Sequence, residues 1–345
     1  MALYPTVGFL VECKMSEIVS VIITTYKGTN KLRRAIFSAL KQTYENVEVI
    51  VVDDNNPETK DRANTEKIMS EFENINNVRY IKHDHNRNGA VARNTGIKAS
   101  KGQYVAFLDD DDFFLPNRIQ ICVDAIENTE YIACYTKSVL ITNGKIKRVN
   151  DVKIDPSCKD VLLNQNLLGT GSNIFVSKKC LRALQGFDER FLRYQDVEFI
   201  LRVLEYGKMK AVDTITVVKD VEDIRFMPKF MRLKDMQLLF QSTFGKQIEE
   251  LNNDEKWAYY SVKYYDLLLS AFESKRVGNV CAAFSMFHKH CGVHIGFEIK
   301  IIIKGIILCI FPEWYKEKFV QKDSDEPIVL PSDQERMIES MSKEE

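Results

Sequence analysis

The chain has 345 residues, of which 45% are hydrophobic and 28% are charged, and its formal net charge is -1. A chain of this size and composition can bury a full core, and its length predicts two domains or one domain with a helical extension. Because binding to nucleic acid normally shows as a surplus of Lys and Arg, this charge balance excludes nucleic acid as an expected partner.

The eight cysteines contain no C-x-x-C pair, and no secretory signal pattern opens the chain. We therefore expect reduced thiols and a cytoplasmic location. Residues 1–17 precede the first strand pattern and are expected to form an N-terminal extension, either a loosely ordered terminus or a functional arm.

Residues 18–116 alternate apolar, β-branched runs with helical periodicity, which predicts βαβ units and a mostly parallel sheet. Near-continuous apolar runs are typical of strands that are covered on both faces. The expected strands are Ile18–Tyr26, Val47–Asp54, Val78–His83 and Tyr104–Asp112, and the expected helices are Lys31–Gln42, Thr65–Phe72 and Gly89–Ala99.

Polar side chains stand at the C-terminal ends of three of these strands, namely Thr24–Tyr26, Asp53 with Asp54, and Asp109–Asp112. In an open α/β sheet such strand ends line the crevice where ligands bind. We therefore expect three stretches that are far apart in the sequence to meet at one site.

The second half predicts a different architecture. Residues 117–224 contain a helix, two strands and a further helix, and are expected to hold a second substrate. Residues 225–321 show long helical patterns without strands, and the acidic residues 322–345, which are short of aromatics, are expected to form a disordered tail. The expected elements of this half are Asn117–Glu127, Tyr131–Ile141, Ser172–Val176, Asp196–Tyr206, Phe230–Phe244, Lys256–Phe272 and Val277–His288.

The aspartate run Asp109–Asp112 predicts a metal site. Like charges this close raise one another's pKa unless a cation lies between them, and carboxylate oxygens favour Mg²⁺ or Mn²⁺ over zinc. Few protein ligands would leave room for the phosphate oxygens of a nucleotide. Taken alone, the run is equally consistent with a solvated acidic loop that caps the helix starting at Asn117. The polar ends of the other two strands favour the metal.

Asp53 and Asp54 lie in a segment with strong turn chemistry, so a simple turn explains them as well. An ionised carboxylate accepts hydrogen bonds only, and it can accept the imide N–H of uracil, which cytosine lacks. Their position at a strand end favours this second interpretation, and it predicts a uridine ligand.

Four segments in order resemble the motifs of family 2 glycosyltransferases of the GT-A fold, as found in bacterial surface-polysaccharide synthesis: VSVIITTYKG, VEVIVVDDNNP, NGAVARNTGIKASKGQYVAFLDDDDFFLP and GFDERFLRYQDVEFILRV. The resemblance extends from Val19 to Tyr206. It implies an α/β fold with a Rossmann-like, mostly parallel sheet and helices on both faces, followed by a C-terminal helical extension. Residues 18–116 would then bind the nucleotide-sugar and residues 117–224 the acceptor.

The resemblance also implies roles for single residues. Thr24, Tyr26 and Asp54 would contact the uridine, and Arg93 would reach the base or the phosphates. Asp109 and Asp111 would form the D-x-D motif, with Asp111 as the main metal ligand and Asp109 facing the ribose as well. The register is open by one residue, so Asp110 or Asp112 would share the ribose or support the site from behind.

Asp196 aligns with the catalytic carboxylate of the family's Glu-Asp motif, in which Gln195 replaces the usual Glu. The acceptor hydroxyl must lose its proton as it attacks the anomeric carbon, so Asp196 would be the general base. The metal and Arg93 would stabilise the departing diphosphate, and in-line attack would invert the anomeric configuration. An N-cap of the following helix is the structural alternative for Asp196. Glu198, Asp188 and Glu189 are the other local candidates for the base.

Three further features of the sequence are open to a functional and a structural interpretation. Gly169–Ser172 predicts a flexible loop beside the acceptor site, or a plain turn. The apolar segment 294–315, with flanking lysines, Trp314 and Tyr315, is too short to span a bilayer and predicts either an interfacial helix on an anionic membrane or a core or homo-oligomer contact. Several Cys and His residues cluster without the spacing of a zinc site: Cys281, His288, His290, Cys291 and His294.

The sequence therefore predicts a cytoplasmic, peripheral, Mn²⁺- or Mg²⁺-dependent glycosyltransferase. It would transfer a sugar from a UDP-sugar to a hydroxyl of a saccharide, either a lipid-linked oligosaccharide or a surface polysaccharide. A sugar-phosphate nucleotidyltransferase is the rival enzyme, but TTYKGTNK is a poor version of the glycine-rich loop that it needs. A catalytically inactive carbohydrate-binding or scaffold protein is the rival without an activity, and the intact Asp111 and Asp196 argue against it.

Overall fold

The computed structural model describes residues 17–27, 30–164, 167–221, 229–312, 330 and 332–342. The N-terminal extension expected at residues 1–17 lies outside these ranges except for its last residue. Trp314 and Tyr315, two of the expected membrane anchors, also lie outside them.

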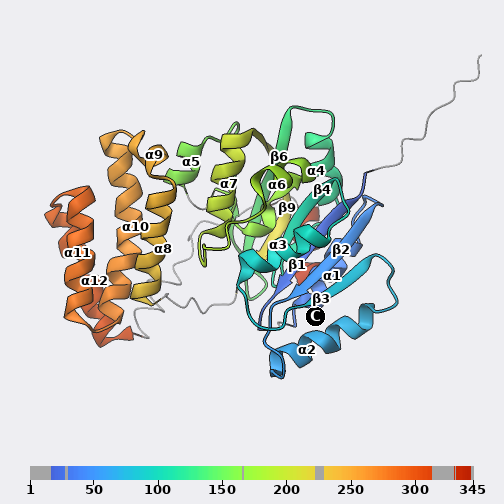
Figure 1. Ribbon diagram of the computed structural model, residues 1–345, viewed down its shortest axis with the longest axis horizontal. Coiled ribbons are helices and arrows are strands. Elements are labelled where there is room, and N and C mark those ends of the chain that lie inside the picture. The colour runs from blue at the N-terminus through green and yellow to red at the C-terminus, as the bar shows by residue number, and fades with distance from the viewer. Residues whose placement is uncertain are drawn as a thin grey trace, which may run out of the picture.

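The centre of the molecule is a mixed sheet that the helices cover on both faces (Figure 1). Its strands follow the order β3-β2-β1-β4-β8-β6-β9-β5, and β7 pairs with β6. The strands are β1 (Val19–Thr25), β2 (Val47–Asp53), β3 (Val78–Lys82), β4 (Tyr104–Asp109), β5 (Phe113–Phe114), β6 (Tyr131–Thr142), β7 (Lys145–Asn150), β8 (Phe175–Ser177) and β9 (Lys208–Asp220).

The first four strands are parallel, as the sequence predicts. Their apolar residues alternate between the two faces, so each face carries its own set of buried side chains. One face is covered by α1 (Leu32–Leu40), α2 (Lys60–Met69), η1 (Ser70–Phe72) and α4 (Arg118–Ile126), and the other by α3 (Gly89–Ala99), α6 (Lys178–Leu184) and α7 (Gln195–Tyr206). The expected α/β fold is confirmed.

The second half of the sheet departs from the expected strand list. β8 is antiparallel to β4 and β6, whereas β6 and β9 are parallel. β7 and β9 were missed because lysine and aspartate interrupt their apolar residues. The strand expected at Ser172–Val176 begins later, because Gly171–Asn173 forms the 3-10 turn η2. Between β7 and η2 lies the short helix α5 (Cys158–Leu163).

The region after residue 229 is helical and shares the core of the sheet. It contains α8 (Phe230–Thr243), α9 (Gly245–Glu249), α10 (Asn253–Glu273), α11 (Val277–Cys291) and α12 (Ile295–Ile310). One cluster of buried residues runs from Phe107 in β4 through Phe199 in α7 to Phe240 and Tyr264 in α8 and α10. Figure 1 shows α8 next to the sheet side of the molecule and α11 and α12 at its far end.

The prediction of a disordered tail at residues 322–345 is wrong for residues 332–342. Ser332–Ser342 forms the helix α14, and Ile338 in it is only 1% exposed. Ile338 and Leu330 pack against Phe113 of β5 and Val139 of β6. The acidic composition concealed a short apolar stripe, Met337-Ile338 and Met341, which is sufficient to hold one helix against the sheet. Residues 322–329 lie outside the described chain.

The packing of α3 on the sheet gives a test of the fold. A Cβ at Gly96 would lie 2.3 Å from Cγ2 of Ile22, so we expect Gly96→Ala to lower the free energy of unfolding by about 1–3 kcal/mol. Gly278 in α11 has open space around the same position, so Gly278→Ala should be neutral or slightly stabilising. Urea unfolding of both variants measures the difference, and equal stabilities would contradict the close packing of α3.

Candidate active site

The C-terminal ends of β1, β2 and β4 lie side by side at one edge of the sheet. In the parallel register Thr24 stands beside both Val52 of β2 and Asp109 of β4, and Thr25 stands beside Asp53. The three polar stretches that the sequence singled out therefore meet, as expected for ligand sites of open α/β sheets.

Each aspartate of the run has different surroundings. Asp109 ends β4 and pairs with Arg93 of α3, with 2.7 Å between Oδ1 and Nη2. Asp110 accepts a hydrogen bond from the hydroxyl of Thr25. Asp111 is half-buried, and its backbone carbonyl accepts a hydrogen bond from Arg34 at 3.0 Å.

Asp112 is the most buried of the four carboxylates, with 1% of its surface exposed. It accepts hydrogen bonds from the hydroxyls of Thr170 (2.7 Å) and Ser172 (2.6 Å) and from the backbone N–H of Asp220 (3.3 Å). These partners come from the turn before β8 and from the end of β9. Asp112 thus anchors two loops behind the site, and both of its oxygens accept hydrogen bonds from them.

Burial raises the pKa of Asp110 and of Asp111 to about 7, and that of Asp112 to about 8. For Asp111 the next causes are the charges of Asp109 and Asp110. An acid whose pKa is raised in this way favours either a proton or a nearby cation. The run is therefore an unfavourable cluster of charge that a divalent ion would stabilise.

The donor atoms fit a hard divalent cation that is held only in part by protein. The oxygens of Asp111 and Asp109 are suitable ligands for Mg²⁺ or Mn²⁺, whereas Asp112 is committed to its loops. The described residues contain no group of three or more His, Cys, Asp or Glu side chains placed to hold a metal. A metal here would need further ligands, and the phosphate oxygens of a nucleotide would be suitable ones.

Arg93 connects the aspartate run to α7. Its Nη1 donates to Oε1 of Gln195 at 2.7 Å while its Nη2 pairs with Asp109, and its guanidinium lies 5.5 Å from the ring centroid of Phe187. Gln195, the departure from the family's Glu-Asp motif, therefore still contacts the site. It accepts the hydrogen bond of Arg93 as a neutral group.

Asp196 lies in the first turn of α7 and faces the same space. A Cβ built on Gly171 would lie 3.6 Å from Nη2 of Arg93, 3.8 Å from Cβ of Asp196 and 3.9 Å from Oδ2 of Asp109. These three side chains therefore border one space beside Gly171, and Oδ1 of Asp196 accepts the N–H of Val197 at 2.9 Å. The arrangement brings a carboxylate of α7 close to Arg93 and to Asp109 of the aspartate run.

The other carboxylates near Asp196, and its own position at the start of a helix, can now be described. The N-cap of α7 is Tyr194, which makes no side-chain cap, whereas Oδ1 of Asp196 accepts the N–H of Val197 in the first turn at 2.9 Å. Glu198 is buried in an ion pair with Arg202, Asp188 pairs with Arg190, and Glu189 accepts a hydrogen bond from Asn94. The turn Gly169–Ser172 is not the flexible loop that was expected, because its hydroxyls are bonded to Asp112.

The residues expected to contact uridine differ in their exposure. Tyr26 follows β1 and is 48% exposed, and Thr24 is half-buried. Asp54 is only 2% exposed, and its two oxygens already accept four hydrogen bonds from residues 83–88. The donors are the side chains of His83 and Asn86 and the backbone N–H groups of Arg87 and Asn88.

Those four bonds fill the acceptor capacity of the carboxylate. In this structure Asp54 therefore orders the segment 83–88, and its contact with the base stays a prediction. No pattern in the sequence pointed to this role, because the donors lie about thirty residues further along the chain.

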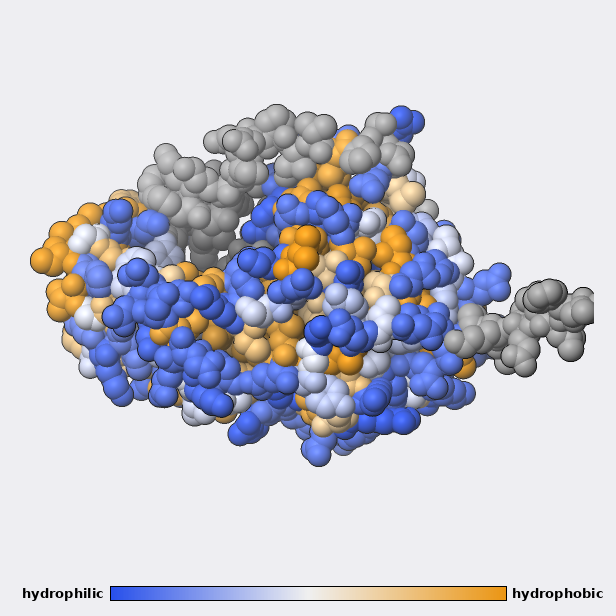
Figure 2. Space-filling view, turned by 90° about the horizontal axis from the view of Figure 1, so that it is seen from above, coloured by the Kyte–Doolittle hydropathy of each residue, from blue (hydrophilic) through white to orange (hydrophobic). Residues whose placement is uncertain are grey.

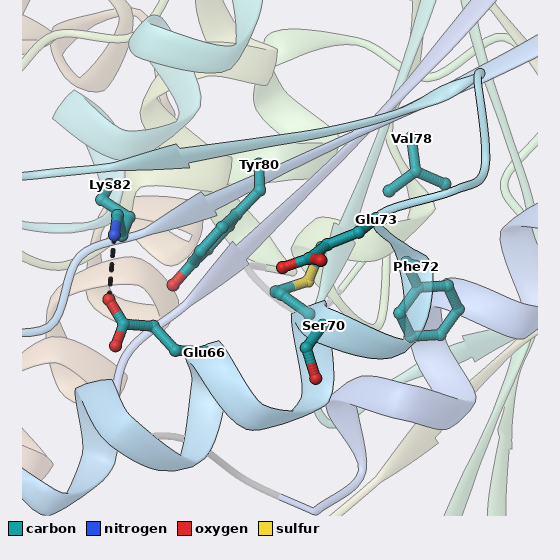
Figure 3. A pocket seen from close by; sticks show the side chains of 8 residues that line it. Glu66, Ser70, Phe72, Glu73, Val78, Tyr80 and Lys82 are labelled. Atoms are coloured by element: carbon teal, nitrogen blue, oxygen red, sulfur yellow. Dashed lines mark hydrogen bonds and ion pairs between the residues drawn. The ribbon is translucent and has the colours of Figure 1, made fainter.

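A separate pocket of about 450 Å³ lies between α2 and β3 at the outer edge of the sheet (Figure 3). Glu66 and Lys82 form an ion pair on one side of it, and the hydroxyl of Tyr80 reaches from it to Asp53 at 2.6 Å. None of the residues expected to carry the chemistry lines this pocket, so it is not the active site.

The Cys and His residues of the helical region do not form a metal site. His290 stacks on Tyr260 at 4.4 Å between ring centroids, and His288 lies 3.1 Å from Glu298. Each of these two histidines has a local structural partner, and the described part of the helical region holds no group of three or more His, Cys, Asp or Glu side chains placed around a metal.

Comparisons with known proteins agree with this geometry. Residues 20–184 match the glycosyl transferase family 2. The uncharacterized glycosyltransferase RP339 of Rickettsia prowazekii is 40% identical over 293 residues, which cover 76% of this chain and 87% of that protein. The Escherichia coli protein WfgD, named as a UDP-Glc:alpha-D-GlcNAc-diphosphoundecaprenol beta-1,3-glucosyltransferase, is 30% identical over 173 residues, or 47% of this chain and 66% of that protein.

The crystal structure of S. aureus TarS 1-349 in complex with UDP-GlcNAc has a TM-score of 0.58 and 15% sequence identity. The match covers 91% of this chain and 94% of that chain, and at this identity it concerns the fold. The chain spans about a third of the length of three further Rickettsia glycosyltransferases that it matches.

The raised pKa values give a test of the metal site. The native state of the apo protein holds protons on Asp110, Asp111 and Asp112 that the unfolded chain loses near pH 4, so its stability should fall as the pH rises from about 4 to about 8. In EDTA the Tm should be lower at pH 8 than at pH 6, and Mn²⁺ should raise it more at pH 8. Asp111→Asn should weaken both effects, and an equal response of this variant to Mn²⁺ would exclude Asp111 as a ligand.

Proposed function

The chain belongs to glycosyltransferase family 2, and from that membership we propose that it is an inverting, metal-dependent transferase that moves a sugar from a UDP-sugar to a hydroxyl of a saccharide acceptor. The observation that supports this most directly is the space beside Gly171, which Asp196, Arg93 and Asp109 border together. A single displacement needs a base on one side of the sugar and positive charge around the diphosphate on the other, and Asp196 and Arg93 are groups of these two kinds.

Each residue of the site has a different role in the proposed reaction. Asp196 accepts the proton of the acceptor hydroxyl as its oxygen attacks the anomeric carbon. Arg93, held by Asp109 and Gln195, stabilises the negative charge of the UDP leaving group. Asp111 and Asp109 would hold Mn²⁺ or Mg²⁺, which acts as a Lewis acid toward the diphosphate when bound. Attack from the side opposite the leaving group inverts the anomeric centre.

The nucleoside end of the donor would lie at the ends of β1 and β2. Tyr26 offers an exposed ring there, and Thr24 of β1 and Asp110, which directly follows β4, would lie toward the ribose. Ordering of the segment 83–88 by Asp54 would shape the wall of the base pocket. The uracil preference and these contacts belong to the proposal.

The assignment of the base can be tested with one pair of variants. Asp196→Asn keeps the shape and removes the proton acceptor, so kcat for sugar transfer should fall by about 10²–10⁴. Asp188→Asn in the same segment removes a carboxylate that pairs only with Arg190, and it should stay near the wild-type rate. UDP binding with Mn²⁺ should be unchanged in both.

A panel of UDP- and GDP-sugars, assayed with Mn²⁺ for transfer and donor hydrolysis, would first identify the donor. Full activity of Asp196→Asn would remove it as the base. If the protein neither binds nor turns over any nucleotide-sugar, the proposal that it is a glycosyltransferase is wrong.

We also propose that the acceptor is lipid-linked and that α12 holds the enzyme on the inner face of the membrane. Six isoleucines on one face of α12 are between 38% and 67% exposed: Ile295, Ile299, Ile302, Ile303, Ile306 and Ile310. Figure 2 shows this apolar surface at the end of the molecule formed by α11 and α12. No described helix is long and apolar enough to cross a bilayer.

Charge favours an anionic lipid surface as the occupant of this face. Lys300 is exposed on α12 and Lys289 at the end of α11, next to the isoleucines. An apolar helix face with flanking lysines is typical of interfacial helices on anionic leaflets. The name of the E. coli relative, with its undecaprenol-linked acceptor, supports the same substrate class.

Vesicle binding tests the surface. Replacing Ile299 and Ile303 together by Asp should lower binding to vesicles of phosphatidylcholine and phosphatidylglycerol in equal parts by at least about tenfold, since each buried isoleucine contributes roughly 1.5–3 kcal/mol. Ile154→Asp, at an equally apolar position that is 76% exposed, should bind as the wild type does. A dimer in light scattering that the double variant abolishes, without vesicle binding, would assign the face to a second copy instead.

A further inference from the structure

Lys263 of α10 is a buried amine in the helical region, far from solvent. The residue is 3% exposed, and its Nζ has no hydrogen-bond partner within the described part of the chain. A buried ammonium without hydrogen bonds or a paired charge destabilises a fold by several kcal/mol. Such a residue is unexpected unless its position serves another purpose.

Three aromatic rings surround this amine, and we refer to Tyr194, Phe240 and Tyr259 together as the aromatic cage. Their ring centroids lie 3.7 Å, 4.5 Å and 5.9 Å from Nζ. Cation–π contacts of this kind stabilise a desolvated cation by about 2 kcal/mol. This is less than the stabilisation that the ammonium loses with its hydrogen bonds to water. Burial accordingly lowers the pKa of Lys263 to about 7, although Asp266 and Asp196 favour the charged form.

The nearest ring of the cage belongs to a residue with an unusual backbone. Tyr194 has φ 62° and ψ 25°, the left-handed conformation, which an aromatic residue rarely adopts. Such a conformation is unfavourable and persists only where surrounding contacts fix it. The ring of Tyr194 contacts Lys263, Arg193 and Phe240, whose ring lies 6.0 Å from that of Tyr194.

The backbone of Tyr194 sets the start of α7 and therefore the direction of the next two side chains. Its carbonyl accepts the hydrogen bond of the Glu198 N–H at 2.8 Å, which closes the first helical turn. Gln195 then reaches Arg93, and Asp196 faces the space beside Gly171. If Tyr194 relaxed to an ordinary conformation, both side chains would turn away from the site.

We propose that Lys263 is a positioning residue for the catalytic base, acting through the ring of Tyr194 to hold the left-handed turn that aims Asp196 at the acceptor. The assignment of Asp196 as the base rests on the proposed function. The position of the turn does not, and it can be measured without any substrate. If Lys263 has this role, the helical region contributes to catalysis through α10.

The decisive variant is Lys263→Met, which keeps the length of the side chain and removes its charge. Replacement of a buried, unpaired charge by an apolar group of similar volume is often neutral or stabilising, so its Tm should be equal to or above that of the wild type. Its kcat should nevertheless fall by about tenfold or more, with the KM for the UDP-sugar changed less than about twofold, because misplacement of a catalytic group acts on the chemical step. Lys263→Arg, which retains a cation, should recover most of the rate.

Two further measurements separate positioning from packing. Hydrogen exchange of the amides of residues 195–198 should be faster in Lys263→Met than in the wild type, with or without UDP and Mn²⁺. Lys246→Met removes an exposed lysine of α9 in the same helical region and should change neither exchange nor rate. Tyr194→Leu should reproduce the loss of kcat, and Tyr194→Phe, which keeps the ring, should not.

The outcomes are distinct. A kcat within twofold of the wild type, together with unchanged exchange at residues 195–198, would overturn the positioning role and leave Lys263 as a core residue. If Lys263→Met fails to fold, the two Tyr194 variants decide, and equal rates for them would overturn the proposal. If the wild type transfers no sugar at all, the proposed function fails, while the exchange data still decide whether Lys263 fixes the turn.

Discussion

Four carboxylates at the end of one buried strand repel one another, and the structure around β4 is arranged to distribute that charge. Arg93 of α3 forms an ion pair with Asp109. The hydroxyl of Thr25 in β1 donates a hydrogen bond to Asp110, and the turn before β8 donates one to Asp112. Arg34 of α1 holds the carbonyl of Asp111 and also pairs with Asp220 at the end of β9. The aspartate run thus connects both halves of the sheet, and in the proposed site Asp111 and the second oxygen of Asp109 are the expected ligands of a cation.

This division explains what the sequence alone could and could not predict. Buried parallel strands have a strong apolar signature, so β1, β2 and β4 and the meeting of their ends followed from the pattern. The pattern also placed Asp111 in the site. It did not reveal that Asp112 is an anchor or that Asp54 orders residues 83–88, because those hydrogen-bond partners are set by tertiary packing. For the same reason β9, with its interrupted apolar pattern, and α14, within an acidic stretch, were missed.

The replacement of the family's Glu by Gln195 has a simple electrostatic consequence. Arg93 already neutralises Asp109, and a second carboxylate at position 195 would compete for the same guanidinium. Glutamine accepts the hydrogen bond without adding negative charge beside Asp196. On the proposed function, less of the positive charge of Arg93 is then neutralised by neighbouring carboxylates when the diphosphate departs, so the departure from the motif would change the charge balance of the site and keep its hydrogen bonds.

The helical region connects the two ends of the proposed reaction. α10 packs against α8, α11 and α12, and its Lys263 reaches Tyr194 at the start of α7. The same helix therefore supports the exposed isoleucine face on one side and the turn before Asp196 on the other. A lipid-linked acceptor would arrive from the surface that α12 contacts, and its hydroxyl must meet the base at a fixed distance from that surface. A rigid helix between the proposed membrane contact and the base would keep this distance fixed, whereas a mobile linker would not.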